Sequence, residues 1–184
     1  MEQKSRSPIT MNCSMSGIKP AMLDLPYPPT QVQCRNQDYA DILTFDYCGQ
    51  VSEMSAITQY INNENRLCLP DCTLARTLLA IAMAEMMHLQ KLGELIQLLG
   101  GEVSFAVTQP GGKRAVWTLE YLTLSRDTRR MLCADVEAEQ DAIAQYRAHI
   151  RKINDEYVNA VLRRIIRDEE YHIMLLQGLM EELH

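Results

Sequence analysis

The sequence lacks any C-x-x-C pair, although it contains six cysteines: Cys13, Cys34, Cys48, Cys68, Cys72 and Cys133. A zinc ribbon and a rubredoxin-type iron site are both built from such pairs, so neither is encoded in these 184 residues. Cys68 and Cys72 lie four residues apart near an expected helix start. We interpret them as two ordinary thiols in a reducing compartment.

The chain also has no excess of positive charge. It contains 18 lysine and arginine residues and 24 acidic residues, which gives a net charge of −6. No basic block stands out, which argues against a nucleic-acid surface. No apolar run appears long enough to span a bilayer, and the N-terminus shows no apolar stretch followed by a cleavage site. We therefore expect a cytoplasmic protein with neither nucleic acid nor membrane as a partner.

Proline is scarce beyond residue 30. Five of the seven prolines lie before this residue, and only Pro70 and Pro110 lie after it. Residues 1–35 are expected to form an extended, proline-rich arm, disordered in its first part and packed along the domain in its second. Hydrophobic residues make up 47% of the chain, which is typical of a globular protein. We expect one domain over residues 36–184.

Four long helices are predicted where apolar residues recur every three or four positions without proline. Their expected bounds are about Asn36–Asn63, Asp71–Leu99, Arg126–Ile153 and Asp155 almost to the end, the last one capped by Asn154. Each helix has about 28 residues and is roughly 42 Å long. Residues 101–125 show no helical period, and their extended chain can travel that length. The sequence thus predicts an all-α four-helix bundle with one long crossover between its second and third helices.

A short motif occurs twice, as EMSAITQY at residues 53–60 and as EQDAIAQY at residues 139–146. An E-x-x-H motif follows each copy, with Glu85 and His88 after the first and Glu169 and His172 after the second. In both halves a leucine stands four residues beyond the histidine. Two motifs that recur in the same order at nearly the same separation indicate a twofold repeat of helical pairs.

The repeated acidic and histidine residues are candidate metal ligands. Residues three apart on a helix share a face, so folding would bring these side chains to the bundle centre: Glu53, Glu85, His88, Glu139, Glu169 and His172. Unpaired buried carboxylates are very costly, and the same helix faces have no lysine or arginine. Two divalent cations would neutralise the four carboxylates. Carboxylate and imidazole ligands favour two iron or two manganese ions over structural zinc.

Each candidate also has an ordinary structural interpretation. A single E-x-x-H motif often arises by accident on a surface helix, so Glu85 or Glu169 could be solvated, and His88 could be a hydrogen-bonded core histidine. The register of all six residues favours the metal site, because one glutamate from each of two helices and Glu-x-x-His from the other two is the pattern of dinuclear carboxylate bundles.

Other polar residues near the repeat are assigned by position. Glu137 is expected to be solvated, because only Glu139 precedes its tyrosine by seven residues, as Glu53 does. Glu170 also falls off the apolar face of its helix. His149 has no partner in the first half and is expected on the surface.

Two inward-facing tyrosines, Tyr60 and Tyr146, either pack in the core or hydrogen-bond a metal carboxylate on the facing helix. Asp168, just before the second E-x-x-H motif, could orient a ligand histidine. The methionines near the first motif are expected to fill the core: Met83, Met86 and Met87.

The six candidate ligands and the E-x(6)-Y pattern in both halves resemble the ferritin-like superfamily, in particular its rubrerythrin and manganese-catalase branch, over roughly residues 36–182. The resemblance implies a dinuclear iron or manganese centre that reacts with peroxide or dioxygen. By position, Glu53 and Glu139 would be terminal ligands, Glu85 and Glu169 would bridge, and each histidine would bind one metal.

The resemblance also implies catalytic roles. In manganese catalases the glutamate that matches Glu169 tends to act as a nearby base, so Glu169 is a candidate for proton transfer. A tyrosine hydroxyl, from Tyr60 or Tyr146, is the other candidate.

The leading functional hypothesis is an oxidoreductase that acts on hydrogen peroxide, as a rubrerythrin-type peroxidase or as a catalase. Rubrerythrins usually have a rubredoxin domain with two C-x-x-C pairs, so a peroxidase without them would take electrons from a separate donor. One alternative is ferrous iron oxidation and iron handling, and another is a structural coat or scaffold protein of the same fold. We expect a homo-oligomer.

Overall fold

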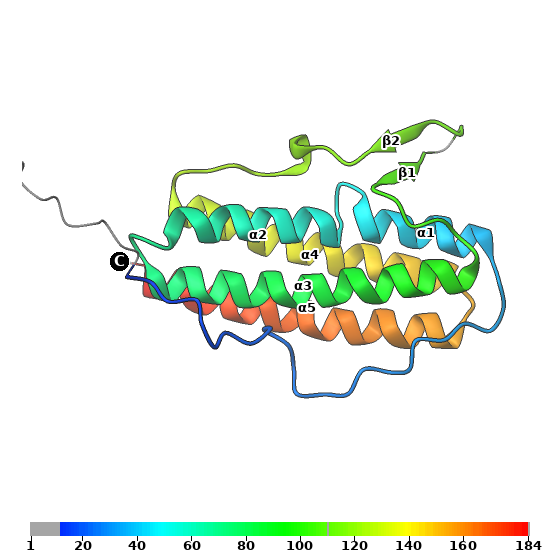
Figure 1. The fold of residues 1–184 in the computed structure, drawn as a ribbon, viewed down its shortest axis with the longest axis horizontal. Helices are drawn as coiled ribbons and strands as arrows, with labels where there is room; N and C mark the ends of the chain where they lie inside the picture. The colour runs from blue at the N-terminus through cyan, green and yellow to red at the C-terminus, as the bar shows by residue number, and fades with distance from the viewer. Residues whose placement is uncertain (1–11, 110, 184) are drawn as a thin grey trace, which may run out of the picture.

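The computed structural model describes residues 12–109 and 111–183 and shows a four-helix bundle, as predicted. Five α-helices build it: α1 (Gln37–Cys48), α2 (Glu53–Leu67), α3 (Cys72–Leu99), α4 (Thr128–Lys152) and α5 (Glu156–Glu182). Helices α1 and α2 lie end to end and together fill one of the four positions in the bundle (Figure 1). The long crossover joins α3 to α4.

Side-chain caps set where the helices begin. Each helix follows a residue whose side-chain oxygen accepts a backbone N–H of the first turn: Asn36, Ser52, Asp71, Asp127 and Asp155. The last helix is therefore capped by Asp155 and not by Asn154, so that prediction is wrong by one residue. Helix α3 ends at Gly100, whose φ of 93° suits glycine.

The prediction of one continuous helix over Asn36–Asn63 is wrong, because the helix breaks between Cys48 and Glu53. A Cβ at Gly49 would lie 2.6 Å from the Phe45 carbonyl oxygen, so this turn of the chain needs glycine. The Ser52 hydroxyl donates to the Gly49 carbonyl and accepts the Ser55 N–H. The break therefore places Glu53 in the first turn of a new helix.

The crossover contains short regular elements that its sequence did not predict. Strands β1 (Ala106–Thr108) and β2 (Arg114–Val116) form an antiparallel hairpin, and a 3₁₀ turn covers Leu119–Tyr121. The crossover runs along α1 and α2 (Figure 1). Gln59 of α2 binds both backbone polar groups of Thr123, at 2.8 and 3.0 Å. The end of the crossover is thus fixed over α2.

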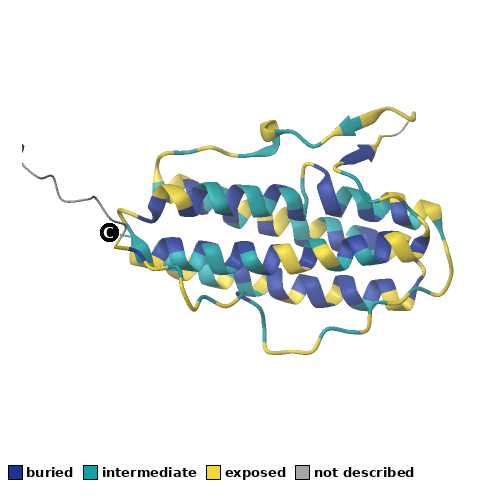
Figure 2. Cartoon of the chain, viewed as in Figure 1, coloured by how far each residue is buried: buried dark blue, intermediate teal, exposed yellow. Residues whose placement is uncertain are grey.

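The buried faces of the helices point into the bundle, as Figure 2 shows. The expectation that no run is long and apolar enough to span a bilayer is wrong for α3 by length and composition, and 44% of its apolar window is buried inside the bundle. The outer side of α3 holds two methionines for which core packing was predicted. Met86 is 44% exposed and Met87 40% exposed, so that prediction is wrong for both.

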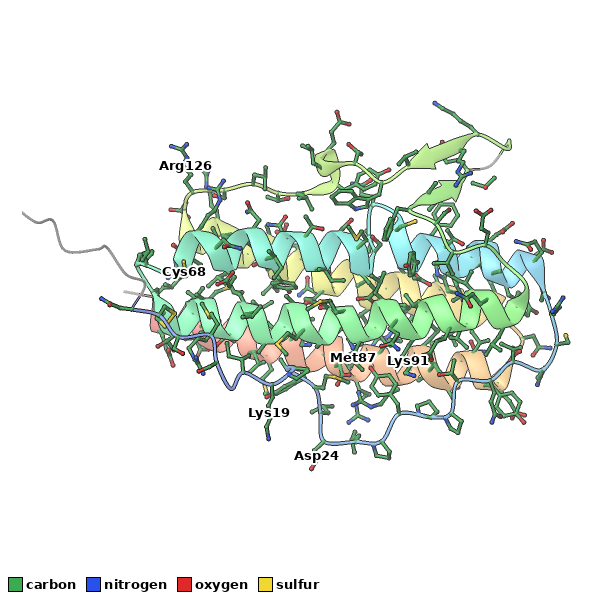
Figure 3. All side chains as sticks on the ribbon, viewed as in Figure 1. Lys19, Asp24, Cys68, Met87, Lys91 and Arg126 are labelled. Atoms are coloured by element: carbon green, nitrogen blue, oxygen red, sulfur yellow. A yellow bond between two sulfur atoms is a disulfide. The ribbon has the colours of Figure 1, made fainter. Side chains whose placement is uncertain are left out.

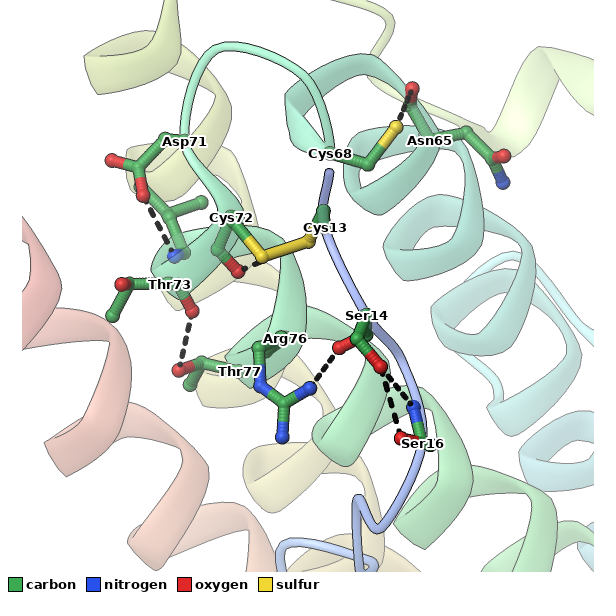
Figure 4. Close-up of a disulfide and its surroundings, with 11 residues drawn as sticks. Cys13, Ser14, Ser16, Asn65, Cys68, Asp71, Cys72, Thr73, Arg76 and Thr77 are labelled. Atoms are coloured by element: carbon green, nitrogen blue, oxygen red, sulfur yellow. Dashed lines mark hydrogen bonds between the residues drawn. A yellow bond between two sulfur atoms is a disulfide. The ribbon is translucent and has the colours of Figure 1, made fainter. Parts of the chain in front are cut away.

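The described part of the arm, residues 12–35, runs along the bundle beside α3 and α5 (Figure 1). Its predicted disordered first part lies mainly in residues 1–11, outside the described residues. Cys13 forms a disulfide with Cys72 at the start of α3 (Figure 4), so the interpretation of Cys72 as an ordinary thiol is wrong. Cys68 is a free, buried thiol. Lys19 and Asp24 of the arm point away from the bundle (Figure 3).

Replacing Gly101 by alanine should destabilise the protein. A Cβ there would lie 2.6 Å from the Ala40 Cβ and 3.0 Å from the Ile96 side chain. Overpacking of this kind costs about 1–3 kcal/mol, which urea denaturation can measure. In the control, Gly178→Ala in α5, the added Cβ meets nothing within 4 Å, so stability should hold or rise by about 0.5–1 kcal/mol. Equal stabilities of the two variants would contradict the close contact between α1 and the end of α3.

Candidate metal centre

The structure brings all six predicted ligands together in the middle of the bundle. They come from α2, α3, α4 and α5, and each is at most 3% exposed: Glu53, Glu85, His88, Glu139, Glu169 and His172. Their ligand atoms form two groups of four, each within 4.8 Å. Glu85 and Glu169 belong to both groups, which is the arrangement expected of bridging carboxylates. Their roles as ligands stay predictions.

Both histidines turn the same nitrogen toward the carboxylates. The Nδ1 of His88 lies 2.8 Å from Glu85 and 3.3 Å from Glu169, and the Nδ1 of His172 lies 3.1 and 3.0 Å from the same two residues. The Nε2 atoms point outward, to Asp168 at 3.2 Å and to the Ala21 carbonyl at 2.8 Å. This arrangement favours a proton on each Nε2 and leaves each Nδ1 lone pair free for a metal.

The donor atoms fit a pair of divalent cations. Three buried polar atoms in the cluster have no hydrogen-bond partner among the described residues: Glu85 Oε1, Glu169 Oε2 and His172 Nδ1. Within the same part of the chain, no lysine or arginine forms an ion pair with the four glutamates. Buried carboxylates that lack hydrogen-bond partners and cationic side chains are very unfavourable unless metal cations neutralise them.

The electrostatics of the cluster show where protons sit when no metal is bound. Burial, reinforced by the charges of Glu85 and Glu169, raises the pKa of Glu53 and of Glu139 well above the usual value. For Glu85, burial acts in the same direction, but His172 and His88 outweigh it and lower its pKa. Burial lowers the pKa of each histidine, yet the surrounding carboxylates raise it overall. The cluster therefore takes up protons that bound cations would replace.

Each tyrosine of the repeat donates to the glutamate of the other repeat. The Tyr60 hydroxyl donates to Glu139, and the Tyr146 hydroxyl donates to Glu53. Burial and the carboxylate charges raise the pKa of both phenols, so they stay neutral donors. This geometry agrees with the predicted bond to a carboxylate on the facing helix.

The repeat extends one helical turn beyond its two tyrosines. His149 is buried and its Nδ1 lies 2.8 Å from Asp46, so the prediction of a surface histidine is wrong. Asn63 stands at the matching position, three residues after Tyr60, and donates to both oxygens of Asp135 at 3.0 Å. The signal was available, because His149 follows Tyr146 by the same three residues.

A cavity of about 200 Å³ leads to the cluster between α2 and α4, beneath Tyr121–Thr123 of the crossover. Its inner end reaches the four candidate glutamates, and its walls include further carboxyl groups: Asp46, Asp135, Glu137 and Asp141. Burial raises the pKa of Asp135 to about 7. Among the residues that the structure describes, no lysine or arginine lines this cavity. The negative lining admits a small neutral molecule or a cation more readily than an anion.

The remaining predictions about nearby carboxylates agree with the structure. Glu137 and Glu170 are exposed, as expected. Asp168 is fully buried and contacts His88, the first candidate ligand histidine. Its burial acts to raise its pKa, but bonds from His88, Arg164 and the Leu23 N–H lower it to about 2. Asp168 is thus an ionised acceptor for the His88 ring.

Metal loading should release protons and should weaken as the pH falls. The raised pKa values of Glu53 and Glu139 mean that both carboxyl groups hold protons at pH values where free glutamate has lost them, and a metal binds only the ionised forms. Calorimetric titration with Mn²⁺ in two buffers of different ionisation enthalpy measures the release. Identical heats in both buffers would contradict this expectation. Glu170→Gln, at an exposed position next to Glu169 and outside the cavity lining, is the control and should behave as wild type.

Comparisons with known proteins agree with this architecture. A family model described as a ferritin-like domain matches residues 72–184, which is more than half of the chain. A Clostridium acetobutylicum protein called a probable manganese catalase is 25% identical over 170 residues, which cover 83% of this chain and 75% of that protein.

Solved structures share the fold. A manganese catalase from Anabaena PCC7120 matches with a TM-score of 0.78 and 23% identity, over 87% of this chain and 78% of its own. The Mycobacterium tuberculosis bacterioferritin BfrA matches with a TM-score of 0.63 and 24% identity, over 81% of this chain and 87% of its own. The chain therefore belongs to the ferritin-like domain family, in which it is a distant relative of the manganese catalases.

Proposed function

We propose that the chain is a dinuclear iron or manganese oxidoreductase that disproportionates hydrogen peroxide, as a catalase does. The observation that carries the proposal is the pair of ligand groups that share Glu85 and Glu169 at the inner end of a small acidic cavity. The likeness to a protein called a probable manganese catalase supports the same reaction.

The cavity suits peroxide as substrate. Hydrogen peroxide is small and uncharged, so the space of about 200 Å³ accepts it and the carboxyl lining does not repel it. Larger or anionic substrates are disfavoured by the same walls. The Trp117 indole N–H donates to Ser55 at 3.0 Å, and this bond helps to hold the crossover over the entrance.

A pair of redox-active metals, when bound, would store the two electrons that pass between two peroxide molecules. One peroxide is oxidised to dioxygen and gives up two protons, and the other takes up two protons and is reduced to two waters. No external electron donor is consumed. The protein would hold the two ions with two ligand groups, one containing His88 and the other His172, that share Glu85 and Glu169.

Glu169 is the candidate to move the protons. It lines the inner end of the cavity, so a carboxylate oxygen of Glu169 that is not bound to an ion could take a proton from one peroxide and return it to the next. The hydroxyl groups of Tyr60 and Tyr146 already donate hydrogen bonds to Glu139 and Glu53, respectively. These bonds hold the two carboxylates in place.

The wild-type protein should contain about two metal ions per chain, measured by mass spectrometry after growth with both iron and manganese and purification without oxygen. The double variant Glu53→Ala, Glu139→Ala should lose both ions together, because each ion loses a carboxylate ligand. The control Glu170→Ala, at an exposed position on α5 outside the cavity lining, should keep them. Wild-type protein that binds no metal would refute the proposal and leave a structural protein of this fold.

Glu169→Gln should keep the metals but lower the rate of oxygen evolution from peroxide by about 10²–10⁴-fold, the usual contribution of a general base. The exposed neighbour Glu170→Gln should behave as wild type. An unchanged rate would contradict the proton-transfer role of Glu169. Loss of metal from Glu169→Gln would instead identify Glu169 as an essential ligand.

Ferrous iron oxidation is the second candidate, and the acidic cavity favours it because carboxylates attract Fe²⁺. Rapid oxidation of added Fe²⁺ by dioxygen, together with a shell-sized assembly in solution, would favour this function over peroxide turnover. A dimer that evolves oxygen from peroxide would oppose it.

A further inference from the structure

The arm touches the metal centre from outside, on the face opposite the cavity that α2 and α4 form. We propose that the arm segment Cys13–Tyr27 is a clamp that positions both metal-binding histidines, fastened to α3 by the Cys13–Cys72 disulfide. This proposal rests on the proposed metal centre and concerns how tightly that centre holds its two ions.

The first contact of the clamp is made by the backbone of Ala21. Its N–H donates to the Ala80 carbonyl of α3 at 2.8 Å, and its own carbonyl lies 2.8 Å from the Nε2 of His172 in α5. Ala21 is itself buried. One residue of the arm therefore links α3 to α5 and gives the outer nitrogen of His172 its hydrogen-bond acceptor.

The second contact is made through Asp168, the buried partner of His88. One carboxylate oxygen of Asp168 lies 3.2 Å from the Nε2 of His88 and accepts the Tyr27 hydroxyl at 2.9 Å. The other oxygen accepts the Leu23 N–H at 2.9 Å. Two groups of the arm thus fix the carboxylate that fixes the His88 ring. A carboxylate partner both orients a metal-binding histidine and makes its ligand nitrogen more basic.

A buried cation holds this part of the arm in place. Arg164 is 7% exposed and pairs with Asp168 at 2.6 Å, and it donates to the carbonyls of Leu23 and Leu25 at 2.9 and 3.2 Å. Its guanidinium lies 4.5 Å above the ring of Tyr27. The arm therefore supplies acceptors that a buried guanidinium requires, and detaching the arm would leave that charge short of partners.

The arm is anchored at both ends of α3. Cys13 is bonded to Cys72, at the first residue of α3, and Arg76 donates to the adjacent Ser14 carbonyl (Figure 4). At the other end, the arm runs into Asn36, the cap of α1, whose N–H donates to the Leu99 carbonyl at 2.9 Å. A covalent tether lowers the conformational entropy that the clamp would gain by detaching from the bundle. The disulfide therefore stabilises the clamp's contacts with the two histidines without contacting either ring.

The two metal positions are unequal in this arrangement. His88 has a carboxylate as its outer partner and His172 has a backbone carbonyl. Because the carboxylate makes the ring a stronger donor, the ion on the His88 side should be held more tightly than the ion on the His172 side.

The test uses the full chain loaded with Co²⁺. Proton NMR of the paramagnetic protein should show two exchangeable imidazole N–H signals, one for each histidine. Tyr27→Phe removes only the hydroxyl bonded to Asp168, so it should shift one signal and speed the loss of one ion to a chelator by about tenfold. The matched control is Tyr39→Phe, which removes a hydroxyl that accepts the Asn154 N–H at 3.1 Å, away from the cluster. It should change neither signal.

The disulfide is tested with Cys13→Ser, Cys72→Ser, against Cys34→Ser at an exposed free cysteine of the arm. The double variant should speed hydrogen exchange of both imidazole N–H groups and the release of both ions, while the control matches wild type. Wild-type protein that binds two Co²⁺ ions, with Tyr27→Phe and the double variant unchanged, would overturn the clamp and leave the metal centre intact. Wild-type protein that binds no Co²⁺ would instead overturn the proposed function.

Discussion

The burial of four carboxylates in the middle of one helix bundle is the constraint on which the rest of the structure depends. Glu53, Glu85, Glu139 and Glu169 are removed from water at a place where the described residues offer no lysine or arginine to pair with them. Such a group is tolerable only if protons or cations neutralise it. The hydrogen bonds that surround the centre hold the buried carboxylates and histidines in fixed positions.

These hydrogen bonds form two groups on opposite sides of the centre, one on the cavity side and one on the arm side. On the cavity side, the repeat supplies matched bonds. A tyrosine donates to Glu53 and another to Glu139, and the pairs Asn63–Asp135 and His149–Asp46 lie one turn beyond. On the arm side the contacts are not repeated, because a single segment meets Asp168 and His172 differently. A repeated helical pair thus gives a nearly symmetric set of candidate ligands, and the arm, which is not repeated, makes their surroundings asymmetric.

The errors of the sequence-based predictions have definite physical reasons. Apolar periodicity extended the first helix through Gly49, but a serine hydroxyl competes for the backbone there and starts a new helix at Glu53. The same periodicity assigned Met86 to the core, although it faces outward. The partner of Cys72 was not predictable, because Cys13 lies 59 residues away and the pairing depends on the path of an arm without periodicity.

By itself, the sequence determined the helical bundle, the long crossover and the set of six residues that meet at its centre. Helical periodicity and the repeated E-x-x-H spacing are local properties, and helices that must bury their apolar faces have few ways to combine. Only the tertiary structure decided the outer partners of the two histidines, the acidic cavity and the disulfide. These features join segments distant in the chain through backbone groups and irregular loops, whose positions no local pattern specifies.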